Sequence, residues 1–303
     1  MTSRGEQTSR VPLGHYVAVA AAYAACYEVA RHFSFSHWML TAGLRLACLL
    51  LVPRRFWPAL VVGEALPMTE SALLCLQDFG AVWTVFASMP VMLLCMPVVA
   101  AIRRRMAMYD DGGRPHMSTI LAATLACAIV TALRNDIGVF IVYLARPDGM
   151  TAWWNEALPD FMAYLLGSYL GALTLTPVLV AIRYSVGLRG HSVHDAIRHP
   201  LLRDTLLLAV PLVMCLVVAI GTHHQGVREL ARVAMIVPVM VATARHGWTG
   251  GAVAGMLASI AMAATTTALL DPAVIRAQVI LSLVISGAMV AGVRIARRAI
   301  RTP

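Results

Sequence analysis

Residues 39–67 read MLTAGLRLACLLLVPRRFWPALVVGEALP, and this stretch decides the fold. Two apolar runs flank a short Pro-Arg-Arg turn at residues 53–55, which predicts a tight antiparallel pair of membrane helices. Each run holds one charge, Arg45 in the first and Glu64 in the second. Both charges lie about nine residues from the turn, roughly 14 Å at about 1.5 Å per residue. That depth is close to the middle of a hydrocarbon layer about 30 Å thick.

The composition of the whole chain excludes an ordinary soluble domain. Hydrophobic residues make up 59% of the 303 residues, charged residues make up 13%, and the mean hydropathy is +0.75. No polar segment exceeds about twenty residues, which is too short to bury a soluble core. The formal charge of +9 comes with 24 basic residues that are all arginine, and most of them fall in short loops. Such a pattern is typical of membrane topology, so no nucleic-acid partner is expected.

Hydropathy divides the chain into about ten apolar segments. These expected spans are roughly 12–31, 37–52, 56–75, 80–102, 118–145, 157–182, 203–222, 229–244, 249–269 and 274–294. Because several are short, eight spans with two re-entrant pieces are the alternative. Seventeen arginines fall on one side of this arrangement and four on the other, which predicts that both chain ends are cytoplasmic. The prediction is thus an all-α, polytopic bundle forming one integral membrane domain over residues 1–303, with short cytoplasmic tails at 1–11 and 295–303.

Arg45 and Glu64 are expected to meet, because the hairpin places them at equal depth. One interpretation is a structural ion pair that fixes the hairpin, since an unpaired charge in hydrocarbon is costly. The other interpretation is a ligand anchor or a proton-sensitive switch. In either case, removing one partner should be more damaging than removing both, because a lone buried charge would remain.

A second set of charges falls toward the outer half of the expected spans. The candidate ligand-binding residues of this set are Glu70, Arg134, Asp136, Asp160 and Arg232, and Arg45 and Glu64 complete the predicted site. Charges of both signs at one depth suit a water-filled vestibule that faces outward. Arg134 and Arg232 would offer bidentate partners to an anionic ligand such as a phosphate or a carboxylate. The alternative is that these residues pair among themselves at the lipid–water boundary.

Glycines at helical spacing predict close helix packing in two places, Gly167 with Gly171 and Gly251 with Gly255. The six cysteines lie in apolar segments without a CxxC pair, and no acidic ligand set accompanies the histidines, so no metal site is expected. The sequence has no GxSxG elbow, P-loop, GxGxxG turn after a strand or HExxH helix. Neither a cofactor nor an enzyme activity is expected.

The hairpin and three later motifs together resemble a known family. The run GLRLACLLLVPRRFWPALVVGE at 43–64 precedes LGSYLGALTLTP at 166–177, RHGWTGG at 245–251, and a final apolar helix at 281–294. In this order, the motifs resemble the bacterial membrane-associated sensor (MASE-type) domain. They look most like the membrane half of hexose-phosphate sensor histidine kinases, and the resemblance covers almost the whole chain.

This resemblance implies a signal-input module of the bacterial inner membrane. Such modules are coupled through their last helix to a histidine kinase, a diguanylate cyclase or a similar output. The sequence stops at Pro303, about ten residues after the last expected span. The expectation is therefore either a sensory module that signals to a separate output partner or the input half of a longer protein. Its expected partners are the lipid bilayer and either a second copy of the chain or a membrane or cytoplasmic signalling protein.

Two other functions remain open at this stage. A proton-coupled small-molecule transporter would use Glu64, Glu70, Asp136 and Asp160, and its flux would collapse in Glu64→Gln. A scaffold subunit of an envelope polysaccharide or signalling complex would co-purify with its partner and would be indifferent to small molecules.

Overall fold

The computed structural model describes residues 12–34, 38–110, 113–145, 149–189, 200–222, 224–265 and 272–301. These residues are almost entirely helical, with isolated extended positions such as the bridge between Tyr109 and Pro115. The prediction of an all-α bundle is confirmed. The expected N-terminal tail at 1–11 lies outside the described residues.

The N-terminal half of the chain forms a first helix group. Its members are α1 (Leu13–His32), α2 (Leu40–Leu51), α3 (Trp57–Leu74), α4 (Leu76–Ala87), α5 (Met92–Arg105), α6 (Met117–Leu144) and α7 (Gly149–Arg189). The hairpin turns as its prolines dictate. Val52 is extended before Pro53, which cannot continue α2, and Pro58 occupies the first turn of α3, where no N–H partner is needed.

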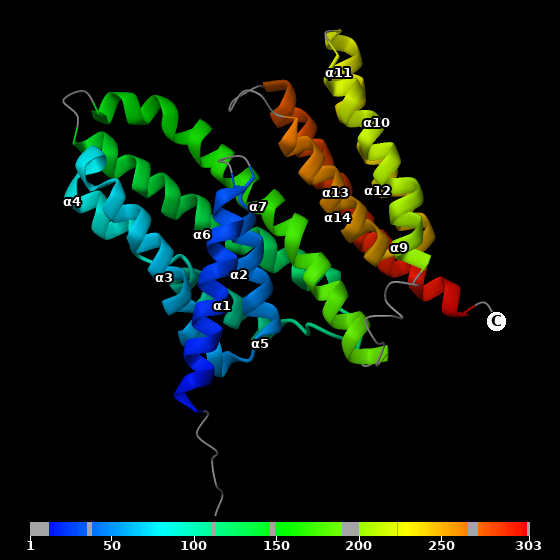
Figure 1. Cartoon of the computed structure of the whole chain (residues 1–303), viewed down its shortest axis with the longest axis horizontal. Helices are drawn as coiled ribbons and strands as arrows, with labels where there is room; N and C mark the ends of the chain where they lie inside the picture. The colour runs from blue at the N-terminus through cyan, green and yellow to red at the C-terminus, as the bar shows by residue number, and fades with distance from the viewer. Residues whose placement is uncertain are drawn as a thin grey trace, which may run out of the picture.

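The C-terminal half forms a second helix group, which lies beside the first in Figure 1. Its members are α9 (Pro200–Asp204), a π-helical turn (Thr205–Ala209), α10 (Val210–Ile220), α11 (Gln225–Ala234), α12 (Ile236–His246), α13 (Trp248–Ala264) and α14 (Pro272–Arg301). Gly247 joins α12 to α13 with a φ of 65°, a conformation that glycine adopts without steric cost. The groups join where α7 packs against α13.

Within the described residues, each expected apolar segment overlaps between one and three consecutive helices. Among the described residues, five helical stretches are long and apolar enough to cross a membrane: Leu76–Arg105, Met117–Leu144, Trp153–Tyr184, Pro200–Ile220 and Ala273–Ile295. The shorter apolar helix α2 rises only about 18 Å, which is less than the hydrocarbon thickness of about 30 Å. The last helix continues to Arg301, so residues 295–301 prolong α14.

Glycine allows α2 and α7 to cross with their backbones in contact. A Cβ atom on Gly171 would collide with the carbonyl oxygen of Met39, and one on Gly43 would collide with the carbonyl oxygen of Gly171. The Met39 N–H donates to the Gly167 oxygen over 2.9 Å, and the Thr176 hydroxyl donates to the Gly43 oxygen over 3.0 Å. Gly167 and Gly171 thus lie at this crossing, together with Gly43.

The second glycine pair lies on α13. A Cβ atom on Gly251 would approach the Thr243 hydroxyl of α12 to 2.7 Å, and one on Gly255 would approach the Ile285 side chain of α14 to 3.2 Å. Small residues here let three helices of the second group pack closely.

Candidate functional site

A buried ion pair joins the two helices of the hairpin. The Arg45 Nε and Nη2 atoms donate to Glu64 Oε1 over 2.8 and 2.6 Å, and the side chains are 4% and 0% exposed. The second carboxylate oxygen of Glu64 accepts the backbone N–H of Met92 over 2.6 Å. Met92 opens α5, where backbone N–H groups have no intrahelical partner, so Glu64 also caps that helix.

Between α4 and α5 the helix is interrupted, and Arg134 of α6 binds the backbone on the α4 side of this break. Its Nη2 atom donates to the carbonyl oxygens of Phe86, Ala87 and Met89 over 3.1, 2.8 and 3.3 Å, at the end of α4 and just beyond it. The guanidinium carbon lies 5.0 Å from the centre of the Phe86 ring. Since a broken helix inside a membrane needs partners for its freed backbone groups, Glu64 and Arg134 together hold the gap between α4 and α5.

A cavity of about 300 Å³ lies beside this break, between helices of the first group. Residues from α1, α2, α3, α6, α7 and the adjoining turns line it: Tyr27, Arg31, Ser34, Met39, Thr41, Arg45, Met68, Val91, Thr131, Arg134, Asn135 and Tyr164. Its wall is mixed, with two intramembrane arginines, hydroxyl groups and two methionines. A lining of this kind suits a small polar ligand that carries negative charge.

A second cavity, of about 380 Å³, shares Arg134, Asn135 and Tyr164 with the first. Its other walls are aromatic and apolar, with Phe79 and Trp83 from α4 and Tyr143 from α6 among them. The Phe79 and Trp83 rings lie 4.7 Å apart. The two cavities therefore meet at Arg134 and differ in polarity, one being rich in hydroxyl groups and the other in aromatic rings.

The structure brings only some of the predicted site residues together. Arg45 and Arg134 line the first cavity. Glu64 pairs with Arg45 but does not itself line the cavity. Glu70 is exposed on α3, outside the lining of either cavity. Asp136 and Asp160 are close enough to interact electrostatically, but neither lines these cavities.

Arg232 lies apart from the other predicted residues. It is buried on α11, which packs against α10 and α14 in the second helix group. Figure 1 shows α11 well away from α6, the helix that carries Arg134. Arg232 therefore does not line either cavity that Arg134 lines, and binding of one anion by both residues stays a prediction.

Sequence reasoning missed the hydroxyl groups of the site. Thr131 lies one helical turn before Arg134 and within 3.5 Å of Arg45 Nη1, and Tyr27 and Tyr164 come from α1 and α7. The spacing of Thr131 from Arg134 was a usable signal, since residues three apart share a helix face. The tyrosines gave no comparable signal, because their convergence depends on how α1 and α7 pack.

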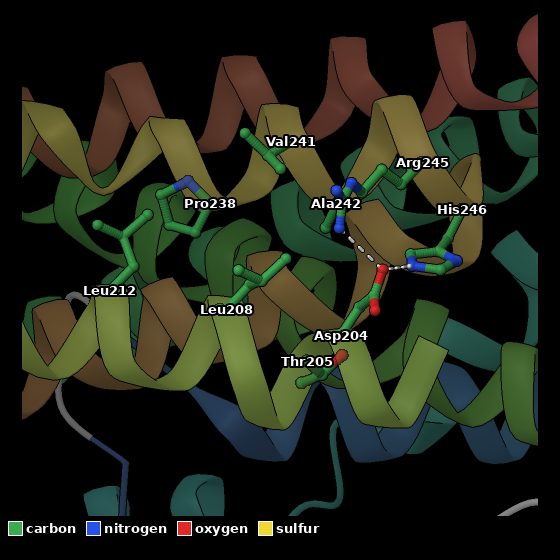
Figure 2. A pocket seen from close by; sticks show the side chains of 10 residues that line it. Asp204, Thr205, Leu208, Leu212, Pro238, Val241, Ala242, Arg245 and His246 are labelled. Atoms are coloured by element: carbon green, nitrogen blue, oxygen red, sulfur yellow. Dashed lines mark hydrogen bonds and ion pairs between the residues drawn. The ribbon is translucent and has the colours of Figure 1, made fainter. Parts of the chain in front are cut away.

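A separate polar cluster lies at one end of the second group, where α9 meets α12 (Figure 2). One oxygen of Asp204 lies 3.1 Å from both Arg245 Nη1 and His246 Nε2. The cavity beside it measures only about 40 Å³, room for a few water molecules at most. Among the described residues, no group of three His, Cys, Asp or Glu side chains could hold a metal ion.

Comparison with known families shows that the MASE1 family model matches residues 10–299. Neither the curated proteins nor the solved structures give a match. The matched region runs from the start of α1 into the last turns of α14, so both cavities and the α4–α5 break lie inside it.

Proposed function

This chain belongs to the MASE1 family of membrane-associated sensor domains, and on that premise we propose that it binds a small anionic ligand and signals its presence to a separate output partner. The proposed location is the inner membrane of a bacterium, with the partner in the cytoplasm or in the same membrane. The proposal assigns binding and conformational coupling to the chain, and no catalytic step.

The observation that carries this proposal is the charge balance of the 300 Å³ cavity. Glu64 neutralises Arg45, whereas Arg134 forms no ion pair with an acidic side chain in the described part of the chain. Arg134 therefore brings a positive charge to the cavity that faces neutral groups, namely backbone carbonyls, the Asn135 side-chain oxygen and the Phe86 ring. An anion would gain charge-assisted hydrogen bonds there, in an interior where such bonds are strong.

The geometry also supports a mechanism of coupling. Arg134 reaches both the cavity and the carbonyl groups that end α4, so an anion would compete with those carbonyls for the same guanidinium group. Weaker hydrogen bonds from Arg134 to these carbonyl groups would favour a different geometry of the α4–α5 break. A ligand shifts such an equilibrium only by the difference in its affinity for the two states. From the cavity wall, α7 leads to α13 and hence to α14, the last helix.

A binding screen on the purified protein tests the proposal. Succinate, aspartate, glucose 6-phosphate and inorganic phosphate are added separately to the protein in neutral detergent, and the melting temperature is measured. A ligand present at about 100 times its Kd stabilises by about 2.7 kcal/mol, which shifts the melting temperature by several degrees. We expect at least one of these anions to stabilise the wild type and to lose most of this effect in Arg134→Gln.

Arg228→Gln is the matched control, because it removes the same charge from a partly exposed position on α11, outside both cavities. Since Arg134 also holds the end of α4, each variant is compared with and without ligand rather than with the wild type. A full ligand shift in Arg134→Gln would place the binding site elsewhere. No shift with any of the four anions in the wild type would contradict an anionic ligand of these classes.

The environment of Glu64 argues against its use as a proton carrier. Its side chain is 0% exposed and accepts hydrogen bonds from Arg45 and from the Met92 N–H. A carrier must take up and release a proton, and protonation of Glu64 would remove the negative charge that balances Arg45 in the buried interior. Ion flux into proteoliposomes that disappears in Glu64→Gln would nevertheless favour the transporter.

A further inference from the structure

A third cavity, of about 440 Å³, lies at the other end of α2, α5 and α7. Its walls are Leu50, Leu51, Val52, Pro53, Arg103, Tyr109, Gly113, Arg183 and Tyr184. On α7, Arg183 follows Tyr164 by about nineteen residues, which corresponds to roughly 28 Å along the helix. This basic cavity is therefore separate from the cavity proposed to bind the sensed ligand.

Arg103 lies on one wall of the basic cavity, in the last turn of α5. Its Nη1 atom donates to the Leu49 carbonyl oxygen over 3.2 Å and so satisfies one of the free carbonyl groups at the end of α2. A guanidinium group has five N–H donors, so most of those on Arg103 are left for another acceptor. In the part of the chain that the structure describes, Arg54 lies within electrostatic range of Arg103 and adds positive charge rather than neutralising it.

Arg183 and two tyrosines complete the polar part. Arg183 is exposed near the end of α7, and in the described part of the chain no acidic side chain forms an ion pair with it or with Arg103. Tyr109 and Tyr184 border the same space with their hydroxyl-bearing rings. The part of the wall at residues 50–52 is apolar. The cavity thus offers two cationic groups beside an apolar surface.

The position of the cavity indicates which anions can reach it. The hairpin turn and the last turn of α5 hold five arginines: Arg54, Arg55, Arg103, Arg104 and Arg105. The arginine distribution predicts that this end of the helices faces the cytoplasm. The inner leaflet there carries anionic lipids, and basic pockets between membrane helices bind their headgroups. Soluble phosphate esters reach the same end from the cytoplasm.

We propose that the cavity between Arg103 and Arg183 binds a phosphate group, supplied either by an anionic phospholipid or by a soluble phosphate ester. Tyr184 connects this site to the second helix group, because its ring lies 5.8 Å from that of Trp248 at the start of α13. A bound phosphate group would draw the ends of α5 and α7 together next to this contact. The site does not depend on the function proposed above.

Lipid titration measures the site directly. The detergent-solubilised protein is titrated with dioleoyl phosphatidylglycerol or with dioleoyl phosphatidylcholine, and native mass spectrometry gives the Kd of the first bound lipid. We expect phosphatidylglycerol to bind at least ten-fold more tightly. Arg183→Gln should remove about this ten-fold preference, as expected for the loss of one charge-assisted contact. Arg183→Lys, which keeps the charge, should retain part of it.

The matched control is Arg105→Gln, since Arg105 is exposed at the end of the same helix as Arg103 but does not line the cavity. A second arm adds inorganic phosphate to the protein in phosphatidylcholine nanodiscs, with chloride at equal ionic strength as the reference, and follows the melting temperature.

The results distinguish an anionic phospholipid from a soluble phosphate ester as the source of the phosphate group, and they can also contradict the proposed site. A phosphatidylglycerol preference that Arg183→Gln loses and Arg105→Gln keeps supports a lipid headgroup. A phosphate-induced rise in melting temperature with the same pattern supports a soluble ester. Equal losses in Arg183→Gln and Arg105→Gln would mean diffuse attraction to a basic surface. That result, or the absence of both effects in the wild type, would overturn the proposal.

Discussion

Replacing Glu64 by glutamine should lower the free energy of unfolding by about 3–5 kcal/mol, the usual cost of leaving a buried charge without its partner. Arg45 would keep its positive charge at a position where its side chain is only 4% exposed. The single oxygen of glutamine can still accept the Met92 N–H, so the cap on α5 survives, while Arg45 loses both the opposite charge and its acceptor. Unfolding in SDS-containing mixed micelles, followed by tryptophan fluorescence, measures the change.

The double variant Arg45→Met/Glu64→Gln should recover most of this loss, because no unpaired charge then remains. Glu70→Gln is the matched control, since Glu70 lies on the same helix but is exposed. We expect it to change the free energy of unfolding by less than about 0.5 kcal/mol. A double variant that loses as much stability as the single variants Arg45→Met and Glu64→Gln added together would show that Arg45 and Glu64 act independently.

Placing a side chain at Gly171 should have the second large effect. A Cβ atom there would collide with the Met39 carbonyl group, and this backbone is held in place because the Met39 N–H donates to the Gly167 oxygen. Backbone cannot rotate away as a flexible side chain does, so α2 and α7 would have to separate. We expect Gly171→Ala to cost about 1–3 kcal/mol and Gly171→Val to cost more. The same unfolding measurement applies.

Gly287→Ala is the matched control, because it makes the same change inside α14 at a position with nothing within 4 Å of the added atom. Alanine there should be neutral or stabilising by up to about 1 kcal/mol, since it lowers the backbone entropy lost on folding. Opposite signs for the two substitutions would assign the cost at Gly171 to the α2–α7 contact. Equal stability of the two variants would contradict that contact.

Much of the fold could be predicted because lipid imposes a simple requirement. A helix exposed to hydrocarbon needs an apolar run, and each predicted run overlaps between one and three consecutive helices of the described residues. The break within Leu76–Arg105 was not predicted, since local hydrogen bonds satisfy its backbone groups only in part and the remaining groups need distant partners. Those partners are Arg134 and Glu64, which lie far away in the sequence.

The candidate site shows the same division. Arg45 and Arg134 stand out in the sequence because each is a charge inside an apolar run, and the structure brings both to one cavity. Arg232 stands out equally, yet it belongs to the second helix group. Periodicity and depth are properties of a single segment and carry no information on which helices become neighbours.

The sequence by itself determined that this protein is an all-helical membrane bundle and that a hairpin brings Arg45 and Glu64 to equal depth. The family match over residues 10–299 agrees with the order of motifs that the sequence displays. Only the tertiary structure decided where the cavities lie and which charges line them. The physical reason is that helix neighbours are selected by close packing, as at Gly43 and Gly171, and such contacts join residues more than one hundred positions apart.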